Sequence, residues 1–89
     1  MGTRVALIGI IFEDKEHAKR INTILHEYEG YIVGRMGVPN IKERIQVISV
    51  VIDAPEDMIS SLSGKLGMIK GVSAKVIYYK ENEKSGKNK

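Results

Sequence analysis

The fold is decided by residues 62–72, LSGKLGMIKGV, which are typical of a helix end, a glycine stop and the start of a strand. Gly67 is expected to adopt the left-handed conformation that ends a helix. Lys65 would then lie in the last turn, where a cation meets the negative end of the helix dipole. Apolar residues at helical spacing form one stripe that can face a core: Met58, Ile59, Leu62, Leu66 and Ile69.

Gly64 lies on the outer face of this helix, opposite the apolar stripe. A glycine there costs about 1 kcal/mol relative to alanine and packs nothing in its own core. Two interpretations remain open. Either the helix frays from Ser63 onward, or a second chain or a ligand comes close to the backbone at Gly64.

Two continuous apolar runs, residues 4–12 and 45–52, are typical of strands buried on both faces. We therefore place both in the centre of a sheet. Residues 72–79 predict the last strand of the domain. Its alternate apolar residues share one face: Val72, Ala74, Val76 and Tyr78.

A weaker strand is predicted over residues 31–37, because Gly34 and Gly37 interrupt it. Arg35 within it needs solvent or a partner, so we expect this strand at a sheet edge. Residues 38–44 follow as a turn-forming loop.

Two helices separate these strands. Residues 15–28 have the apolar period of a helix, and Asp14 is positioned to cap its start. The second helix is expected to begin with Asp53 as N-cap, Pro55 in the first turn and Glu56 as the acid of a capping box.

The order strand–helix–strand–strand–helix–strand predicts an α+β, ferredoxin-like βαββαβ sandwich. Its four-stranded antiparallel sheet would carry two helices on one face. We expect one domain over residues 1–80, with a disordered polar tail over residues 81–89. Because the helices cover only one apolar face of the central strands, the other face predicts a homo-oligomer, a dimer or a tetramer.

The composition excludes several classes of function. The chain of 89 residues has no cysteine, which rules out disulfides and thiolate metal sites. No signal peptide or membrane-spanning run is visible, so we expect a cytoplasmic protein without a membrane partner. The net charge of +3 comes largely from the tail, which makes nucleic acid a weak inference. No helix-turn-helix segment is visible for DNA, although the open sheet face leaves RNA binding as a minor alternative.

No catalytic residue, metal or cofactor is expected. His17 and His26 lie on opposite sides of the first helix and cannot share a metal ion. Ser63, followed by a glycine and a lysine, fails the phosphate-loop pattern on both sides. Glu13 and Asp14 are adjacent in a loop, where capping explains them without general acid–base chemistry.

The segment RMGVP, residues 35–39, together with residues 62–72 resembles the family of iron-only hydrogenase system regulators. The resemblance extends over residues 4–80. It implies a ferredoxin-like fold related to ACT domains and to the ligand-binding half of the nickel regulators. It also implies a regulatory role associated with hydrogenase maturation, without a defined reaction or functional residues.

In ACT-like domains, the loop after the first strand meets a neighbouring chain and forms a groove. The corresponding loop here contains Glu13 and Asp14, beside a helix N-terminus that favours anions. Our candidate ligand-binding residues are these two, the segment of Gly34, Arg35 and Gly37, and Gly64. Alternatively, Arg35 pairs with a surface carboxylate and the glycines serve a bent edge strand.

The leading hypothesis is a non-enzymatic regulatory domain, a transcriptional regulator that responds to a small-molecule effector or binds a protein partner. It rests on the lack of a catalytic constellation in a fold whose relatives sense ligands. The alternative is a structural accessory protein that docks onto a partner enzyme or maturation factor.

Overall fold

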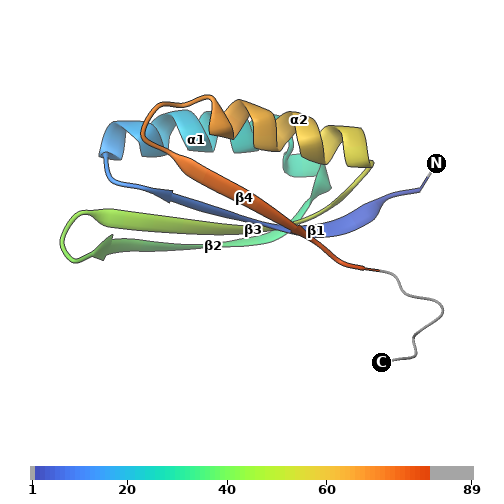
Figure 1. Cartoon of the computed structure of the whole chain (residues 1–89), viewed down its shortest axis with the longest axis horizontal. Helices are drawn as coiled ribbons and strands as arrows, with labels where there is room; N and C mark the ends of the chain where they lie inside the picture. Colours follow the sequence, from blue (N-terminus) through green and yellow to red (C-terminus); the bar gives the residue numbers. More distant parts are fainter. Residues whose placement is uncertain (1, 81–89) are drawn as a thin grey trace.

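The computed structural model describes residues 2–80 of the chain, so the predicted polar tail lies outside the described residues. A sheet forms one layer and two helices form the other (Figure 1). The elements are β1 (Arg4–Phe12), α1 (Lys15–Glu27), the short 3-10 helix η1 (Glu29–Tyr31), β2 (Ile32–Ile41), β3 (Ile45–Ala54), α2 (Glu56–Gly67) and β4 (Ser73–Tyr78). The strands are antiparallel in the order β2-β3-β1-β4. The predicted ferredoxin-like fold, with β1 and β3 central, is confirmed.

The core lies between the sheet and the helices. In the central pair, Ile8 is opposite Val50, and both are fully buried beneath the helices. Their neighbours in sequence point to the other side of the sheet because side chains alternate along a strand. Leu7 and Ile11 are 39% and 50% exposed there. The expectation that β1 is buried on both faces is therefore wrong for the single chain.

The hairpin between β2 and β3 is tighter than expected. β2 continues to Ile41, which pairs with Ile45, so only residues 42–44 form the turn where a loop over residues 38–44 was predicted. The ladder shifts register between Val38 and Ile41. Pro39 is tolerated within this interval because β2 is an edge strand.

The predicted start of α2 is wrong. Asp53 does not cap the helix, because it belongs to β3 and pairs with Val5 of β1. Pro55 takes the N-cap position without a side-chain cap, and Glu56 is the first helical residue. Glu56 instead forms an ion pair with Arg4, at 3.1 Å from Oε1 to Nη1. Pairing of β3 with β1 up to Ala54 overrides the local capping signal.

The end of α2 also differs from the prediction. The helix continues unbroken to Gly67, so fraying from Ser63 onward is wrong. Gly67 is helical rather than left-handed, and Met68 is the C-cap. The left-handed glycine is Gly71, with φ of +89°, at the turn into β4. Because the apolar Ile69 also reaches the core, at 3% exposed, the chain reverses two residues beyond it rather than at Gly67.

No helix in the described part of the chain is both long and apolar enough to span a bilayer.

Candidate functional site

The side chain of Arg35 lies on the helix-facing side of the edge strand β2. Arg35 pairs in register with Val50, whose side chain is buried beneath the helices, so the two share a face of the sheet. One guanidinium nitrogen, Nη2, donates a hydrogen bond to Oδ1 of Asn22 on α1. The arginine thus joins the sheet edge to the first helix while remaining exposed to solvent.

A shallow groove of about 270 Å³ opens on one side of this hydrogen bond. Its apolar walls include Phe12, Ala18 and Ile48, and Gly37 of β2 also borders it. Its polar groups come from three separate elements: Asn22 on α1, Arg35 on β2 and Gln46 on β3. The groove therefore combines one cation and two amides with an apolar floor.

A second hollow, of about 460 Å³, lies on the other side of the Arg35–Asn22 pair. It is lined in part by His26 and Glu29, whose Nδ1 and Oε1 atoms are 3.1 Å apart. A carboxylate is thus already present on this side of Arg35. An anion is better accommodated in the groove beside Gly37, whose lining residues include no acid.

Only part of the predicted site comes together. Arg35 and Gly37 both border the groove. Glu13 follows Phe12 at its end and forms an ion pair with Arg44, 3.4 Å from Oε1 to Nε. Asp14 caps α1 as predicted, with Oδ1 accepting a hydrogen bond from the Glu16 amide at 3.0 Å.

The other two predicted residues lie elsewhere. Gly34 pairs with Val51 and faces the side of the sheet without helices. Gly64 lies on the exposed face of α2, and a Cβ placed there would meet no atom within 4 Å. Neither residue borders the groove. Within residues 2–80, Gly64 has no close neighbour that would explain a glycine at this position.

The alternative explanation for Arg35 had two parts, a surface carboxylate as its partner and a bent edge strand, and the structure agrees only with an irregular edge strand. Among the described residues, no carboxylate forms an ion pair with Arg35, and its partner is the Asn22 amide. The edge strand is irregular, however, with a register shift between Ile32 and Gly34.

Sequence reasoning missed Asn22 and Gln46. Gln46 carried a usable signal, because β3 buries every second residue and Ile48, Val50 and Ile52 occupy that register. Gln46 is the next position in the same alternation and is polar. Asn22 gave no comparable signal, since its role depends on the crossing of α1 over β2.

The histidines do not form a metal centre. His26 is exposed and pairs with Glu29, whereas Nδ1 of His17 is buried without a hydrogen-bond partner in the structure. Nowhere in residues 2–80 do three potential ligands from histidine, aspartate and glutamate cluster.

The TM1266-like family, described as iron-only hydrogenase system regulator, matches residues 4–76. The chain belongs to this family. A member of known structure, the uncharacterised protein TM1266 from Thermotoga maritima, is 38% identical, with a TM-score of 0.81. That alignment covers 88% of this chain and 99% of TM1266. The resemblance expected from residues 35–39 and 62–72 is thereby confirmed.

More distant structures share the fold of this TM1266-like chain. The ACT domain of the GTP pyrophosphokinase from Chlorobium tepidum is 23% identical, with a TM-score of 0.71, covering 84% of this chain and 99% of that domain. A PII-like nitrogen regulatory protein from Thiomonas intermedia is 16% identical, with a TM-score of 0.54, covering 86% and 96%. No curated protein matches the sequence.

Proposed function

We propose that this chain is a non-enzymatic regulatory domain that binds a small carboxylate in the Arg35 groove. The observation that carries the proposal is that Arg35 borders a groove with apolar walls, with Asn22 as its partner and no ion-paired carboxylate among residues 2–80.

The donor geometry suits a carboxylate. Guanidinium has five N–H donors, and the hydrogen bond to Asn22 uses one nitrogen of the fork. The remaining donors can hold a carboxylate with two parallel hydrogen bonds, the strongest arrangement for this pair. The amide of Gln46 provides a further polar contact across the groove.

The apolar walls select the rest of the ligand. Phe12, Ala18 and Ile48 would cover a short aliphatic group attached to the carboxylate. A groove of about 270 Å³ is small, so it favours a metabolite of the size of an amino acid or short-chain acid.

The comparisons support a regulatory role. The matching family is described as a regulator, and the ACT and PII-like folds belong to proteins named for regulation or nucleotide metabolism. The PII-like protein was solved with ADP, AMP and bicarbonate, a small carboxylate-like anion. For this chain, binding of such an anion is our proposal.

Catalysis has no visible support in residues 2–80. The hydroxyl of Ser61 is hydrogen-bonded to that of Tyr28 rather than to a histidine. Both histidines lie on α1, and neither forms a hydrogen bond with a serine. A nucleophile paired with a base, which acyl transfer requires, is not present in that part of the chain.

Titration of the isotope-labelled protein tests the proposal. The probes are bicarbonate, acetate, butyrate and L-valine. Their binding is measured from the NMR signals of the Asn22 and Gln46 side-chain amides. At least one probe should give saturable shifts there. Arg35→Gln should weaken its affinity at least tenfold, and Arg35→Lys less, since lysine retains the charge without the fork.

Arg20→Gln is the matched control, because Arg20 is also exposed on α1 but does not border the groove. It should bind like the wild type, and Arg35→Gln should keep its melting temperature and oligomeric state. If no probe saturates, or if Arg35→Gln unfolds or dissociates, the site assignment is wrong.

A second candidate is a structural accessory protein that docks onto an enzyme or maturation factor. The apolar, helix-free face of the sheet favours it. A stoichiometric partner recovered with the chain and unaffected by the four probes would support this candidate over the first.

A further inference from the structure

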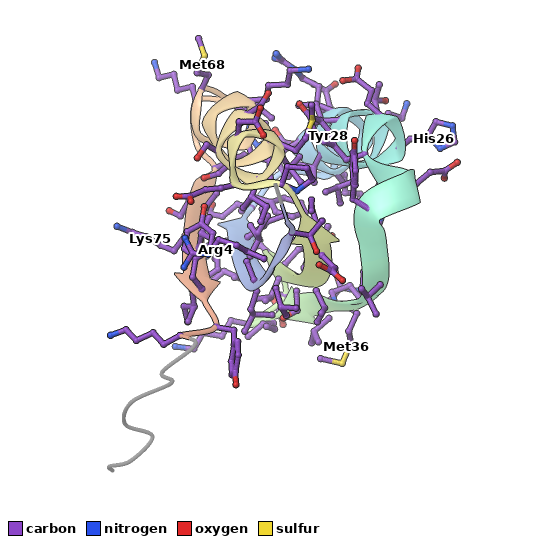
Figure 2. All side chains as sticks on the ribbon, turned by 90° about the vertical axis from the view of Figure 1, so that its right-hand side faces the viewer. Arg4, His26, Tyr28, Met36, Met68 and Lys75 are labelled. Atoms are coloured by element: carbon purple, nitrogen blue, oxygen red, sulfur yellow. The ribbon has the colours of Figure 1, made fainter. Side chains whose placement is uncertain are left out.

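The sheet face without helices exposes a continuous apolar surface. Met36, labelled in Figure 2, lies on this face, opposite the helices. Eight large apolar side chains on it are between 38% and 66% exposed: Val5, Leu7, Ile11, Met36, Val38, Val51, Ile77 and Tyr79. We call this surface the open face.

The open face is low at its centre. Gly9 of β1 lies opposite Ser49 of β3, so the middle of the two central strands carries no large side chain. A Cβ at Gly9 would meet no atom within 4 Å in this chain. Directly beside this low point, Leu7 on the same strand projects from the same face.

The exposed area matches a dimer interface. From their exposed fractions, these eight residues expose on the order of 700 Å², backbone atoms included, which is above the roughly 300–600 Å² of the largest apolar patch on a typical monomer. It approaches the roughly 800 Å² that each partner buries in a stable interface.

We propose that the open face binds a second copy of this chain, with Leu7 of each copy seated over Gly9 of the other. A two-fold axis across the strands, between the level of Leu7 and the level of Gly9, exchanges these two positions. The same patch then serves both copies, as a two-fold interface requires. Leu7 fills the space above Gly9, and two sheets can pack at about 10 Å.

The same axis also brings together apolar residues further along β1 and on β4. It places Ile11 of the other copy over an apolar hollow of about 320 Å³ that Val5, Leu7 and Ile77 line. It sets Ile77 over the aliphatic stem of Lys75 in the other copy, since Ile77 and Lys75 lie beside Leu7 and Gly9 on β4.

Charge also favours this placement. Lys75 is on the edge strand β4, and Figure 2 shows it extending away at the side of the sheet. Its ammonium can therefore reach water while its stem is covered. An axis centred on Gly9 itself would place Lys75 of one copy against Lys75 of the other. Repulsion between these two like charges disfavours that axis.

This inference goes beyond the proposed function and does not depend on it, because neither Leu7 nor Gly9 borders the Arg35 groove. Sedimentation at 10 µM should show the wild type as a dimer, or as a tetramer containing this pair. Gly9→Val should weaken dimerisation at least tenfold because its side chain occupies the place of Leu7. It should leave the isolated chain folded and no less stable, since valine suits a strand and its Cβ would meet no atom within 4 Å.

Gly37→Val is the matched control. Gly37 is also a strand glycine at which an added Cβ would meet no atom within 4 Å. It lies opposite Ile48, on the helix side of the sheet. It should leave the dimerisation constant unchanged.

Cysteine cross-linking tests the register directly, because the chain has no cysteine of its own. Sheets packed at about 10 Å are too far apart for a direct disulfide, so a bismaleimide with a span of about 10 Å is used. A Leu7→Cys chain mixed with a Gly9→Cys chain should cross-link more completely with this reagent than either chain alone. A monomeric wild type, a dimer unaffected by Gly9→Val, or no preference for the mixed pair would overturn the proposal. So would a different protein bound to this face in place of the second copy.

Discussion

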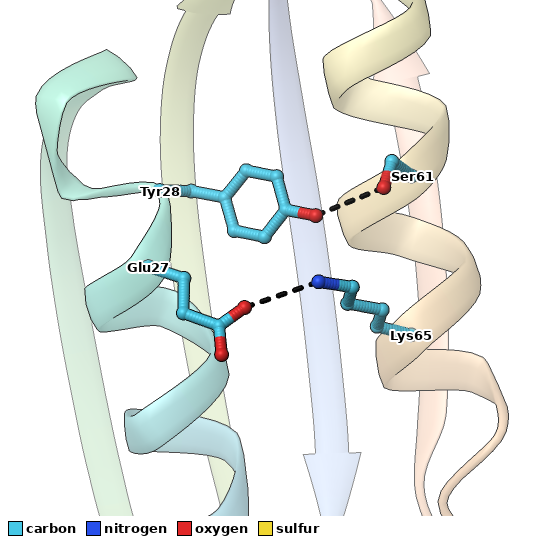
Figure 3. A network of polar contacts seen from close by, with 4 residues as sticks. All are labelled: Glu27, Tyr28, Ser61 and Lys65. Atoms are coloured by element: carbon cyan, nitrogen blue, oxygen red, sulfur yellow. Dashed lines mark hydrogen bonds and ion pairs between the residues drawn. The ribbon is translucent and has the colours of Figure 1, made fainter.

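Nζ of Lys65 on α2 lies 3.1 Å from Oε1 of Glu27 at the end of α1 (Figure 3). The same ammonium is 5.2 Å from the centre of the Tyr28 ring, and the Tyr28 hydroxyl is 2.9 Å from Oγ of Ser61. Two residues at the end of one helix thus bind two residues one turn apart on the other. This network links the two helices where they lie side by side on the sheet.

The Lys65 contacts predict a pH dependence. The hydrogen bond to Glu27, and then that to Tyr28, raise the pKa of Lys65 above its usual value of 10.5. A raised pKa means that the folded state holds the proton more tightly than the unfolded chain. The stabilisation should be complete below pH 10.5 and should be lost as the pH rises through the raised pKa.

Urea unfolding of the wild type and of Lys65→Met between pH 8 and 12 measures this effect. The difference in free energy should be constant below 10.5 and shrink above it. Lys19→Met, which removes an exposed lysine of α1 outside this network, should show no such change. A difference that grows with pH would contradict the assignment.

The Tyr28–Ser61 hydrogen bond predicts a second effect, on stability at neutral pH. Tyr28 is only 7% exposed, so Tyr28→Phe leaves the Ser61 hydroxyl without its partner and should destabilise the fold by about 1 kcal/mol. Ser61→Ala should cost a similar amount. The double variant should lose less unfolding free energy than the sum of the losses in the two single variants. A double-mutant cycle of urea unfolding detects this difference. Strictly additive effects would mean that the hydroxyls do not interact.

The central position of β1 and β3 was predictable because residues 4–12 and 45–52 are continuous apolar runs. These runs are apolar on both faces, so they do not indicate which face the helices cover. The structure places Ile8 and Val50 beneath the helices and leaves Leu7 and Ile11 exposed. That choice depends on how the helices pack against the sheet and has no signal within the two strands.

The helix ends were not predictable in the same way. Asp53 has a typical N-cap side chain, but the β1 ladder keeps it extended opposite Val5. Gly67 is a typical stop, yet the helix includes it and the reversal occurs at Gly71. In both places, long-range packing outweighs a local preference of about 1 kcal/mol.

The candidate site was partly predictable. Arg35 drew attention as a cation between two glycines, and the structure places it with Gly37 beside the groove. Its partner Asn22 is 13 residues away on α1, and no pattern in the sequence encodes that contact. The Glu13–Arg44 pair likewise depends on the hairpin returning beside the start of α1.

Gly64 offers a test of whether anything approaches α2 from outside. In the isolated chain, Gly64→Ala should stabilise the fold by about 1 kcal/mol, since helical glycine is unfavourable and a Cβ there meets no atom within 4 Å. The melting temperature should rise by roughly 4–8 °C. Ser60→Ala, one turn earlier on the exposed helix surface, provides the control for general helix propensity. A loss of stability in Gly64→Ala alone would favour the interpretation that a second chain or a ligand comes close to this backbone.

Gly71 should be the glycine that the fold tolerates least well when replaced. Its φ of +89° is unfavourable for alanine, and a Cβ would lie 3.0 Å from Cε1 of His17. Gly71→Ala should therefore lower the free energy of unfolding by about 1–2 kcal/mol. Gly67→Ala, four residues earlier, is the matched variant and should be neutral or stabilising, because Gly67 is helical with open space around it. Urea unfolding of Gly71→Ala in a His17→Ala background separates the two causes. Removing the imidazole should recover the part of the lost unfolding free energy that is due to the contact, and it should leave the part that is due to φ. Equal effects of the Gly71→Ala and Gly67→Ala substitutions would instead place the end of the helix at Gly67.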